Sequence, residues 1–155
     1  YHFNLAGQTY EVRYVPGASP VPLFGGNSNW RGPVWMPVNH LMVEALQRFG
    51  DYFGESLTVS LPSRNGEGVT TGHTLCDVAE HLARRLDSLF LLDEDGHRVY
   101  RKEKPFLQKT KWRQRLLFHE YFHGDTGRGL GASHQTGWTA VVAWLLHGYG
   151  SHRAP

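Results

Sequence analysis

The sequence predicts an all-α fold in which helices pack in pairs, with a short β-hairpin at the N-terminal end. Two long stretches carry apolar residues at the i, i+3, i+4, i+7 spacing of amphipathic helices, and two shorter apolar runs follow in the last third of the chain. Hydrophobic residues make up 40% of the 155 residues, which is globular composition. We therefore expect one domain, or a piece of a larger one.

The first 24 residues predict a β-hairpin and a proline-rich connector. The segments YHFNLAG and TYEVRYV alternate apolar and polar residues, and Gly7 between them is typical of a hairpin turn. The connector is VPGASPVP, residues 15–22, and a loop with two tryptophans, GGNSNWRGPVWMP, follows at 25–37.

Two amphipathic helices come next. The first begins at Pro37, because proline is favoured at the first position of a helix, and it extends to Phe53. Residues 54–72 are polar and contain glycines, so we expect a loop there, and DEDG at 93–96 predicts a turn after the second helix. The apolar faces of the two helices are Val38, Leu41, Met42, Ala45, Leu46, Phe49 and Phe53, then Leu75, Val78, Ala79, Leu82, Leu86 and Leu89.

Two further helices complete the expected architecture, a third over 111–123 and a fourth over 136–148. Their inward residues are expected to be Trp112, Leu116, Leu117 and Tyr121, then Trp138, Val141, Val142, Leu145 and Leu146. Two helix pairs bury only a thin core, so we expect these helices to form part of a larger helical layer.

Charge and cysteine content limit the partners and the compartment. A basic stretch at 98–115 has aromatic residues between its charges, as nucleic-acid patches do, but a solvated loop entering a helix explains it better, and the net charge is only +2. We therefore expect no nucleic-acid partner. The single cysteine, Cys76, excludes an internal disulfide and fits a reducing compartment. No apolar run reaches the roughly 18 residues of a membrane span, so we expect no membrane partner.

The segment HEYFH at 119–123 matches the H-E-x-x-H zinc motif. On a helix, His119 and His123 would share a face as ligands, with Glu120 as the base. The extended form of the motif needs glycine and histidine where Thr126 and Gly129 stand, and no carboxylate follows Asp125. The candidates for a third ligand are His134, His147 and His152.

Three tryptophans suggest a sugar site instead. Trp30 and Trp35 flank Arg31 in a loop of Gly, Asn and Pro, and Trp138 ends the glycine-rich segment that follows Glu120. Planar aromatic rings stack on the apolar faces of sugars, and arginine, asparagine, glutamine and histidine side chains bond their hydroxyls. A lone carboxylate in such a site can act as a general base.

The stretches GGNSNWRGPVWMPVNHL and FHEYFHGDTGRGLGASHQTGW strongly resemble the C-terminal part of the catalytic domain of glycoside hydrolase family 63, most closely its bacterial branch. The resemblance covers nearly the whole chain. It implies an (α/α)6 toroid of which this chain is the last part, with residues 1–36 as hairpin and substrate loop and 37–155 as four helices. It also implies an inverting α-glycosidase that uses two carboxyl groups and no metal or other cofactor.

Carried over residue by residue, the resemblance makes Glu120 the general base. The substrate-binding residues that it implies are Trp30, Arg31, Gly32, Trp35, Asn39, His134, Gln135, Thr136 and Trp138. The family's general acid is an aspartate in an earlier segment that nothing here matches. We therefore expect this chain to be an excerpt of a catalytic domain, or to be inactive alone, with the remainder of that domain as its partner.

Three functions stay open on the sequence. The first is hydrolysis of α-glucosides or α-mannosides, in small glycosides or oligosaccharides. The second is a zinc metallopeptidase that uses His119, Glu120 and His123. The third is a non-catalytic carbohydrate-binding module. The bacterial resemblance and the absence of a signal peptide lead us to expect a cytoplasmic protein.

Overall fold

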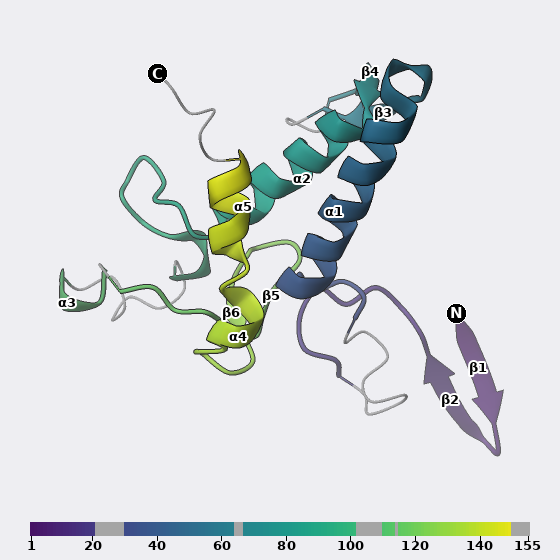
Figure 1. Ribbon diagram of the computed structural model, residues 1–155. Coiled ribbons are helices and arrows are strands. Elements are labelled where there is room, and N and C mark those ends of the chain that lie inside the picture. Colours follow the sequence, from purple (N-terminus) through teal and green to yellow (C-terminus); the bar gives the residue numbers. More distant parts are fainter. Residues whose placement is uncertain (21–29, 64–66, 102–109, 114, 150–155) are drawn as a thin grey trace. The chain divides into compact units, whose positions relative to one another are not determined.

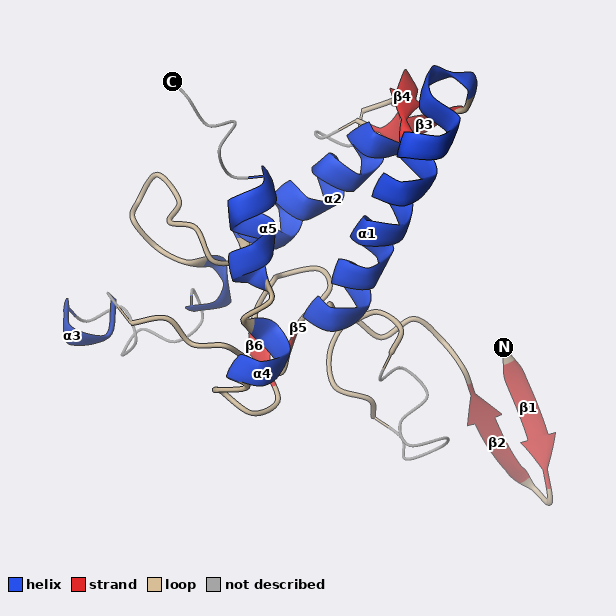
Figure 2. Ribbon diagram, in the orientation of Figure 1, coloured by secondary structure: helices blue, strands red, loops and turns tan. Residues whose placement is uncertain are grey.

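The computed structural model divides the chain into two compact units (Figures 1 and 2). The helical unit comprises Met36–Ser88 and Ala140–Pro155, and the loop unit comprises Tyr1–Trp35 and Leu89–Thr139. The structure describes residues 1–20, 30–63, 67–101, 110–113 and 115–149.

Three helices make up most of the helical unit: α1 (Met36–Phe53), α2 (Leu75–Ser88) and α5 (Val142–Tyr149). In Figure 1, α1 and α2 lie side by side, and α2 packs against both α1 and α5. The first two helices are therefore confirmed close to their predicted bounds. The buried residues of α1 are Met36, Val43 and Gly50, and those of α2 are Ala79, Ala83, Leu86 and Asp87.

Glycine at position 50 sets how closely α1 and α2 approach each other. A Cβ on Gly50 would overlap the Sγ of Cys76 and would lie 2.7 Å from its backbone nitrogen. The thiol of Cys76 accepts a hydrogen bond from Nε2 of Gln47 at 3.2 Å, and burial raises its pKa. Cys76 is therefore a packing residue at the contact between the two helices.

The opposite face of α1 is apolar and exposed. Leu41 is 65% exposed, Met42 52% and Phe49 57%, although an amphipathic helix normally buries such residues. Exposed apolar side chains gathered on one helix face are characteristic of a surface that packs against another element. The larger helical layer expected from the sequence would supply that element, and it stays a prediction.

A β-hairpin occupies the segment that was predicted to be a loop. Strands β3 (Thr58–Pro62) and β4 (Val69–Thr74) pair antiparallel after the short 3-10 helix η2 (Gly54–Ser56). The prediction was wrong because these strands bury no complete apolar face, so the sequence shows little of the alternation by which a strand is recognised. At the end of β4, the side chains and backbone amides of Thr74 and Asp77 form a reciprocal capping box that starts α2.

The predicted N-terminal hairpin is confirmed in the loop unit. Strands β1 (His2–Leu5) and β2 (Gln8–Glu11) pair in register through a two-residue turn. Both turn residues have positive φ, +51° at Ala6 and +77° at Gly7, as a type I′ hairpin requires.

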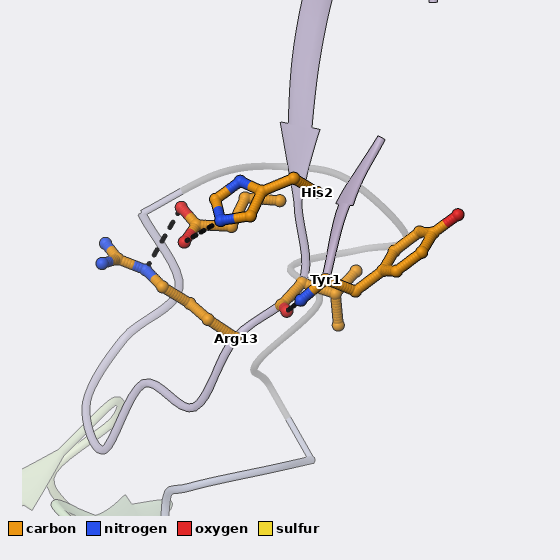
Figure 3. Close-up of polar contacts among 5 residues, drawn as sticks. Tyr1, His2 and Arg13 are labelled. Atoms are coloured by element: carbon orange, nitrogen blue, oxygen red, sulfur yellow. Dashed lines mark hydrogen bonds and ion pairs between the residues drawn. The ribbon is translucent and has the colours of Figure 1, made fainter. Parts of the chain in front are cut away.

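Exposed polar contacts close the open end of this hairpin (Figure 3). The N-terminal amine of Tyr1 donates to the carbonyl oxygen of Val12 at 2.9 Å. The Glu11 carboxylate lies 3.5 Å from Nε of Arg13 and 4.0 Å from Nε2 of His2. Exposed pairs of this kind contribute little to stability, so the turn and the strand pairing define the hairpin.

The predicted third helix is largely wrong, whereas the fourth is helical with one interruption. Among the described residues of 111–123, only the end of α3 (Thr110–Arg113) is helical, and residues 116–120 have no regular secondary structure, with a bend at Glu120. Strand β5 (Tyr121–Phe122) then pairs antiparallel with β6 (Gly129–Leu130). Tyrosine and phenylalanine favour strands, and the glycine-rich stretch after them supplies the turn and the partner strand.

The predicted fourth helix is interrupted between α4 (Thr136–Thr139) and α5, where the chain passes from the loop unit to the helical unit. The all-α class is therefore too narrow, since the described residues also form three two-stranded antiparallel sheets. None of the described helices is long and apolar enough to cross a membrane.

The basic stretch at 98–115 lies partly outside the described residues. Where it is described, Nε of Arg98 donates to the carbonyl oxygen of Phe90 at 2.9 Å. The buried guanidinium of Arg101 donates to the carbonyl oxygens of Trp112 and Arg115. These two cations bind the protein's own backbone, which supports a structural role for this part of the stretch.

The contact at Gly50 predicts a stability effect. Gly50→Ala should force α1 and α2 apart and lower the free energy of unfolding by about 1–3 kcal/mol, the usual cost of overpacking. The matched control is Gly148→Ala in α5, where an added Cβ would meet nothing within 4 Å and stability should be unchanged or slightly higher. Denaturant unfolding measures both, and equal midpoints for the two variants would contradict the packing role of Gly50.

Candidate active site

Glu120 lies in the loop unit, at a bend directly before β5. Its backbone N–H donates to the carbonyl oxygen of Ala132 at 2.9 Å. The N–H of Ala132 donates back to Oε2 of the Glu120 side chain at 3.0 Å. Both the backbone and the carboxylate of Glu120 are thereby tied to one residue of the glycine-rich loop.

Backbone hydrogen bonds join three segments that are far apart in the sequence. Val34 and Phe122 exchange both N–H···O bonds, at 2.8 and 2.9 Å, and the N–H of Gly124 donates to the carbonyl oxygen of Pro16 at 2.8 Å. A Cβ on Gly124 would overlap the carbonyl oxygen of Gly32, which itself has a φ of +98°. Glycine at these positions permits the close approach of the tryptophan loop to the β5 strand.

Four aromatic side chains gather at this junction, and we call Trp30, Trp35, Tyr121 and Trp138 the aromatic cluster. Trp35 is 5% exposed and stacks on Tyr121, with ring centroids 4.6 Å apart. The ring centroids of Trp30 and Trp35 are 4.5 Å apart. Trp138 packs edge-on against Trp35, with ring centroids 6.2 Å apart. Trp30 remains 59% exposed, so one large ring of the cluster is open to a ligand.

The carboxylate of Glu120 lies next to this cluster. A Cβ on Gly131 would lie 2.5 Å from Oε2 of Glu120 and 2.8 Å from Cε1 of Tyr121. The catalytic candidate and a ring of the cluster therefore flank the same glycine. Sequence reasoning missed Tyr121, which it placed on the inner face of a helix, and only the strand conformation puts its ring against Trp35.

The HQTGW segment is tied to the backbone beside Glu120. The N–H of Gln135 donates to the carbonyl oxygen of Phe118 at 2.6 Å, and the hydroxyl of Thr139 donates to the carbonyl oxygen of His119. The ring of His134 packs edge-on against Phe118, with centroids 5.8 Å apart. The HQTGW segment is therefore held near Glu120 by contacts with the two residues that precede it, Phe118 and His119.

The structure places most of the sequence-predicted site residues in one unit. Arg31 is exposed, beside Trp30, and Thr136 begins α4. Asn39 lies on α1 in the helical unit, so its place at the site stays a prediction. The predicted residues within the loop unit are Trp30, Arg31, Gly32, Trp35, Glu120, His134, Gln135, Thr136 and Trp138.

Asp125, the other carboxylate of this segment, is held by Tyr14. The tyrosine hydroxyl donates to Oδ1 of Asp125 at 2.7 Å, and this bond is the main reason that the pKa of Tyr14 is raised. The backbone N–H of Asp125 donates to Nδ1 of His123 at 3.3 Å. Asp125 therefore belongs to the turn between β5 and β6.

The HEYFH segment is not helical, so it lacks the geometry that the zinc motif needs. On a helix, residues four apart share a face, whereas His119 and His123 lie on either side of the short strand β5. His119 is 1% exposed, with its ring packed edge-on against Tyr100. His123 accepts backbone N–H bonds from Asp125 and Thr126 through Nδ1.

Among the described residues, the group whose ligand atoms lie close enough together for a metal ion is elsewhere, at Asp93, Asp95 and His97. There the carboxylate of Asp93 accepts the backbone N–H of His97 at 2.7 Å, and the N–H of Gly96 donates to the Asp93 carbonyl. These bonds form the turn that was predicted at 93–96, and that prediction is confirmed.

Comparison with known proteins identifies relatives of the chain. The family model of the mannosylglycerate hydrolase MGH1-like glycoside hydrolase domain matches residues 10–139. The chain is 48% identical over 149 residues to the uncharacterized protein YMR196W of Saccharomyces cerevisiae, which covers 94% of the chain and 13% of that protein. It is 27% identical over 127 residues to the mannosyl-oligosaccharide glucosidase of the same yeast, covering 79% of the chain and 11% of that protein.

The chain thus spans only a small part of the curated relatives that it matches, 13% and 11% of their lengths. No solved structure matches the chain. The resemblance to glycoside hydrolases is confirmed, while the bacterial branch and the cytoplasmic location stay predictions.

The geometry of the two histidines predicts that they hold no zinc. In the full-length protein, His123→Gln should leave the zinc content unchanged, because the ring of His119 is buried against Tyr100 while Nδ1 of His123 accepts two backbone N–H bonds in the turn. Elemental analysis before and after chelator treatment measures this, with His2→Gln, at an exposed residue of β1 that is not a candidate ligand, as the matched control. Stoichiometric zinc that is lost only in the His123 variant would contradict the prediction.

Proposed function

We propose that this chain, which belongs to the mannosylglycerate hydrolase MGH1-like glycoside hydrolase family, forms part of an inverting α-glycosidase and supplies its general base, Glu120. The observation that carries the proposal is the position of the Glu120 carboxylate beside the aromatic cluster, with Tyr121 and the carboxylate flanking Gly131. A sugar stacked on an aromatic ring there would lie within reach of a carboxylate that can accept a proton.

In this mechanism, Glu120 takes a proton from a water molecule as the water attacks the anomeric carbon. The attack comes from the face of the sugar opposite the leaving group, so the configuration at that carbon inverts. A second carboxyl group protonates the departing glycosidic oxygen, and in inverting enzymes the two groups are about 6.5–9.5 Å apart. Asp125 is bound by Tyr14 and serves the turn, so we place the general acid outside this chain.

The aromatic cluster would bind the substrate. Trp30 presents an exposed ring that is held in place by its contact with Trp35. The polar groups that the resemblance assigns to the site, in Arg31, His134 and Gln135, would bond sugar hydroxyls. The matching family takes its name from a mannosylglycerate hydrolase, and one relative is a mannosyl-oligosaccharide glucosidase. The substrates to test are therefore α-mannosides and α-glucosides.

The remainder of the catalytic domain would complete this site. The exposed apolar residues of α1 suit packing against further helices, as in an (α/α)6 toroid. Nε1 of Trp138 is buried and has no hydrogen-bond partner within the described part of the chain. Because buried donors are normally paired, we propose that residues outside this part supply the acceptor.

The role of Glu120 predicts both the product and the effect of removing the base. In the full-length protein acting on α-glucosides and α-mannosides, proton NMR should show the β-anomer first. Glu120→Gln should lower kcat by roughly two to four orders of magnitude, the usual contribution of a general base. The matched control is Glu55→Gln, at an exposed residue of η2.

Two outcomes would reject this function. Appearance of the α-anomer first would exclude inversion, and an unchanged rate in the Glu120 variant would exclude its role as base. If the Glu120 variant also bound the sugar as tightly as the native protein and neither showed turnover, a non-catalytic carbohydrate-binding module would be the better description.

The exposed ring of Trp30 predicts an effect on substrate affinity. Trp30→Ala should raise KM roughly three- to ten-fold, since aromatic stacking contributes about 0.5–1.5 kcal/mol, while Trp30→Phe should recover part of the loss. Trp144→Ala is the control, because Trp144 is 44% exposed on α5 and belongs to the helical unit. Equal KM values for the Trp30 and Trp144 alanine variants would argue against a stacking role for Trp30.

A further inference from the structure

We infer that Gly131 and the backbone N–H of Ala132 are the positioning elements for Glu120: they hold one carboxylate oxygen and present the other to the attacking water. This inference rests on the function proposed above, because it concerns how the base is aimed. It extends that function to two residues that have no reactive groups of their own.

The first support is the pattern of hydrogen bonds at the carboxylate. Oε2 of Glu120 accepts the N–H of Ala132 at 3.0 Å, while no donor among the described residues reaches Oε1. The backbone N–H of Glu120 donates to the carbonyl of Ala132 at 2.9 Å, so both ends of the glutamate bind the same residue. This closed arrangement restricts the side-chain torsions and leaves Oε1 for a water molecule.

The second support is the requirement for glycine at position 131. Its φ is +64°, a conformation that side-chain-bearing residues rarely adopt. A Cβ there would lie 2.5 Å from Oε2 and 2.8 Å from the Cβ of Glu120, and also 2.8 Å from Cε1 of Tyr121. A methyl group at this point would displace the carboxylate itself.

The β5–β6 pairing explains why these residues meet. Tyr121 is opposite Leu130 and Phe122 is opposite Gly129, so the next residues outward from the turn are Glu120 and Gly131. The hairpin register therefore decides which part of the glycine-rich loop faces the base. Because the donor to the carboxylate is the backbone N–H of Ala132, the position of that donor is set by this register and not by a flexible side chain.

The test uses the full-length protein with Gly131→Ala. A misplacement of about 1 Å can cost roughly 100-fold in rate, so we expect kcat to fall about 10- to 100-fold, with KM changed less than about two-fold because the aromatic rings that bind the sugar remain. Gly7→Ala is the matched control, since Gly7 also has a positive φ, +77°, but its Cβ would meet nothing within 4 Å. The control should keep its native kcat.

A double variant separates positioning from general structural damage. If Gly131 acts through Glu120, adding Gly131→Ala to Glu120→Gln should cause no further loss of kcat, because the base that it aims is already absent. A loss that multiplies with that of Glu120→Gln would overturn the inference. So would a Gly131 variant that keeps its native kcat.

A second change tests the hydrogen bond without adding any atom near the carboxylate. Replacing the Ala132 amide by an ester, through the α-hydroxy acid analogue of alanine, removes the N–H donor alone. We expect a fall in kcat of about ten-fold that likewise disappears in the Glu120→Gln background, in line with loss of one hydrogen bond to a charged group. An ester protein with native kcat would overturn the inference even if Gly131→Ala failed to fold.

The outcomes also separate this inference from the proposed function. If Glu120→Gln keeps its rate, both fail, because there is no base to position. If Glu120→Gln is inactive while the Gly131 and ester variants are fully active, the proposed function stands and only the positioning role is rejected.

Discussion

The candidate site depends on backbone segments that approach more closely than side chains would allow. The reciprocal hydrogen bonds of Val34 with Phe122 attach the tryptophan loop to β5, and those of Glu120 with Ala132 attach the candidate base to the glycine-rich loop. Each contact needs glycine beside it, Gly124 in the first case and Gly131 in the second. The glycines that make the segment look like a simple flexible loop therefore serve close packing.

This construction gives the candidate site a buried floor and an open face. Trp35 and Phe122 are almost fully buried, and the stacking of Trp35 on Tyr121 links the cluster to β5, the strand that follows Glu120. Trp30, by contrast, is largely exposed although it lies against Trp35. A buried ring that orients an exposed one is a sound basis for stacking on a sugar, since the exposed ring loses little freedom when the ligand binds.

Some elements could be predicted from the sequence and others could not, for physical reasons. The helices over Met36–Phe53 and Leu75–Ser88 were predicted because their apolar pattern persists over several turns. The run before His123 is short, and a short apolar run cannot be assigned to helix or strand from its period. Its conformation is decided by Val34 and Gly129, which are distant partners that no local pattern reveals.

The candidate site residues do not depend on the elements that carry them. The tryptophans around Arg31 and the glutamate before a glycine-rich loop suggest a sugar site from residue type and order alone, and the structure brings most of these residues together in one unit. Tyr121 was missed because its contact with Trp35 exists only in the strand conformation. Tyr14 was missed because its partner, Asp125, is 111 residues away in the sequence.

The most direct test of the central claim, that Glu120 is the base of an inverting glycosidase, is a crystal structure of the full-length Glu120→Gln protein with an uncleaved α-glycoside. We expect the sugar on the ring of Trp30, with a water molecule bound to residue 120 on the face opposite the glycosidic oxygen. A carboxyl group from elsewhere in the protein should lie about 6.5–9.5 Å from residue 120, at that oxygen. A separation of about 5–5.5 Å with no room for water would indicate a retaining enzyme, and a sugar bound away from residue 120 would contradict the assignment of the base.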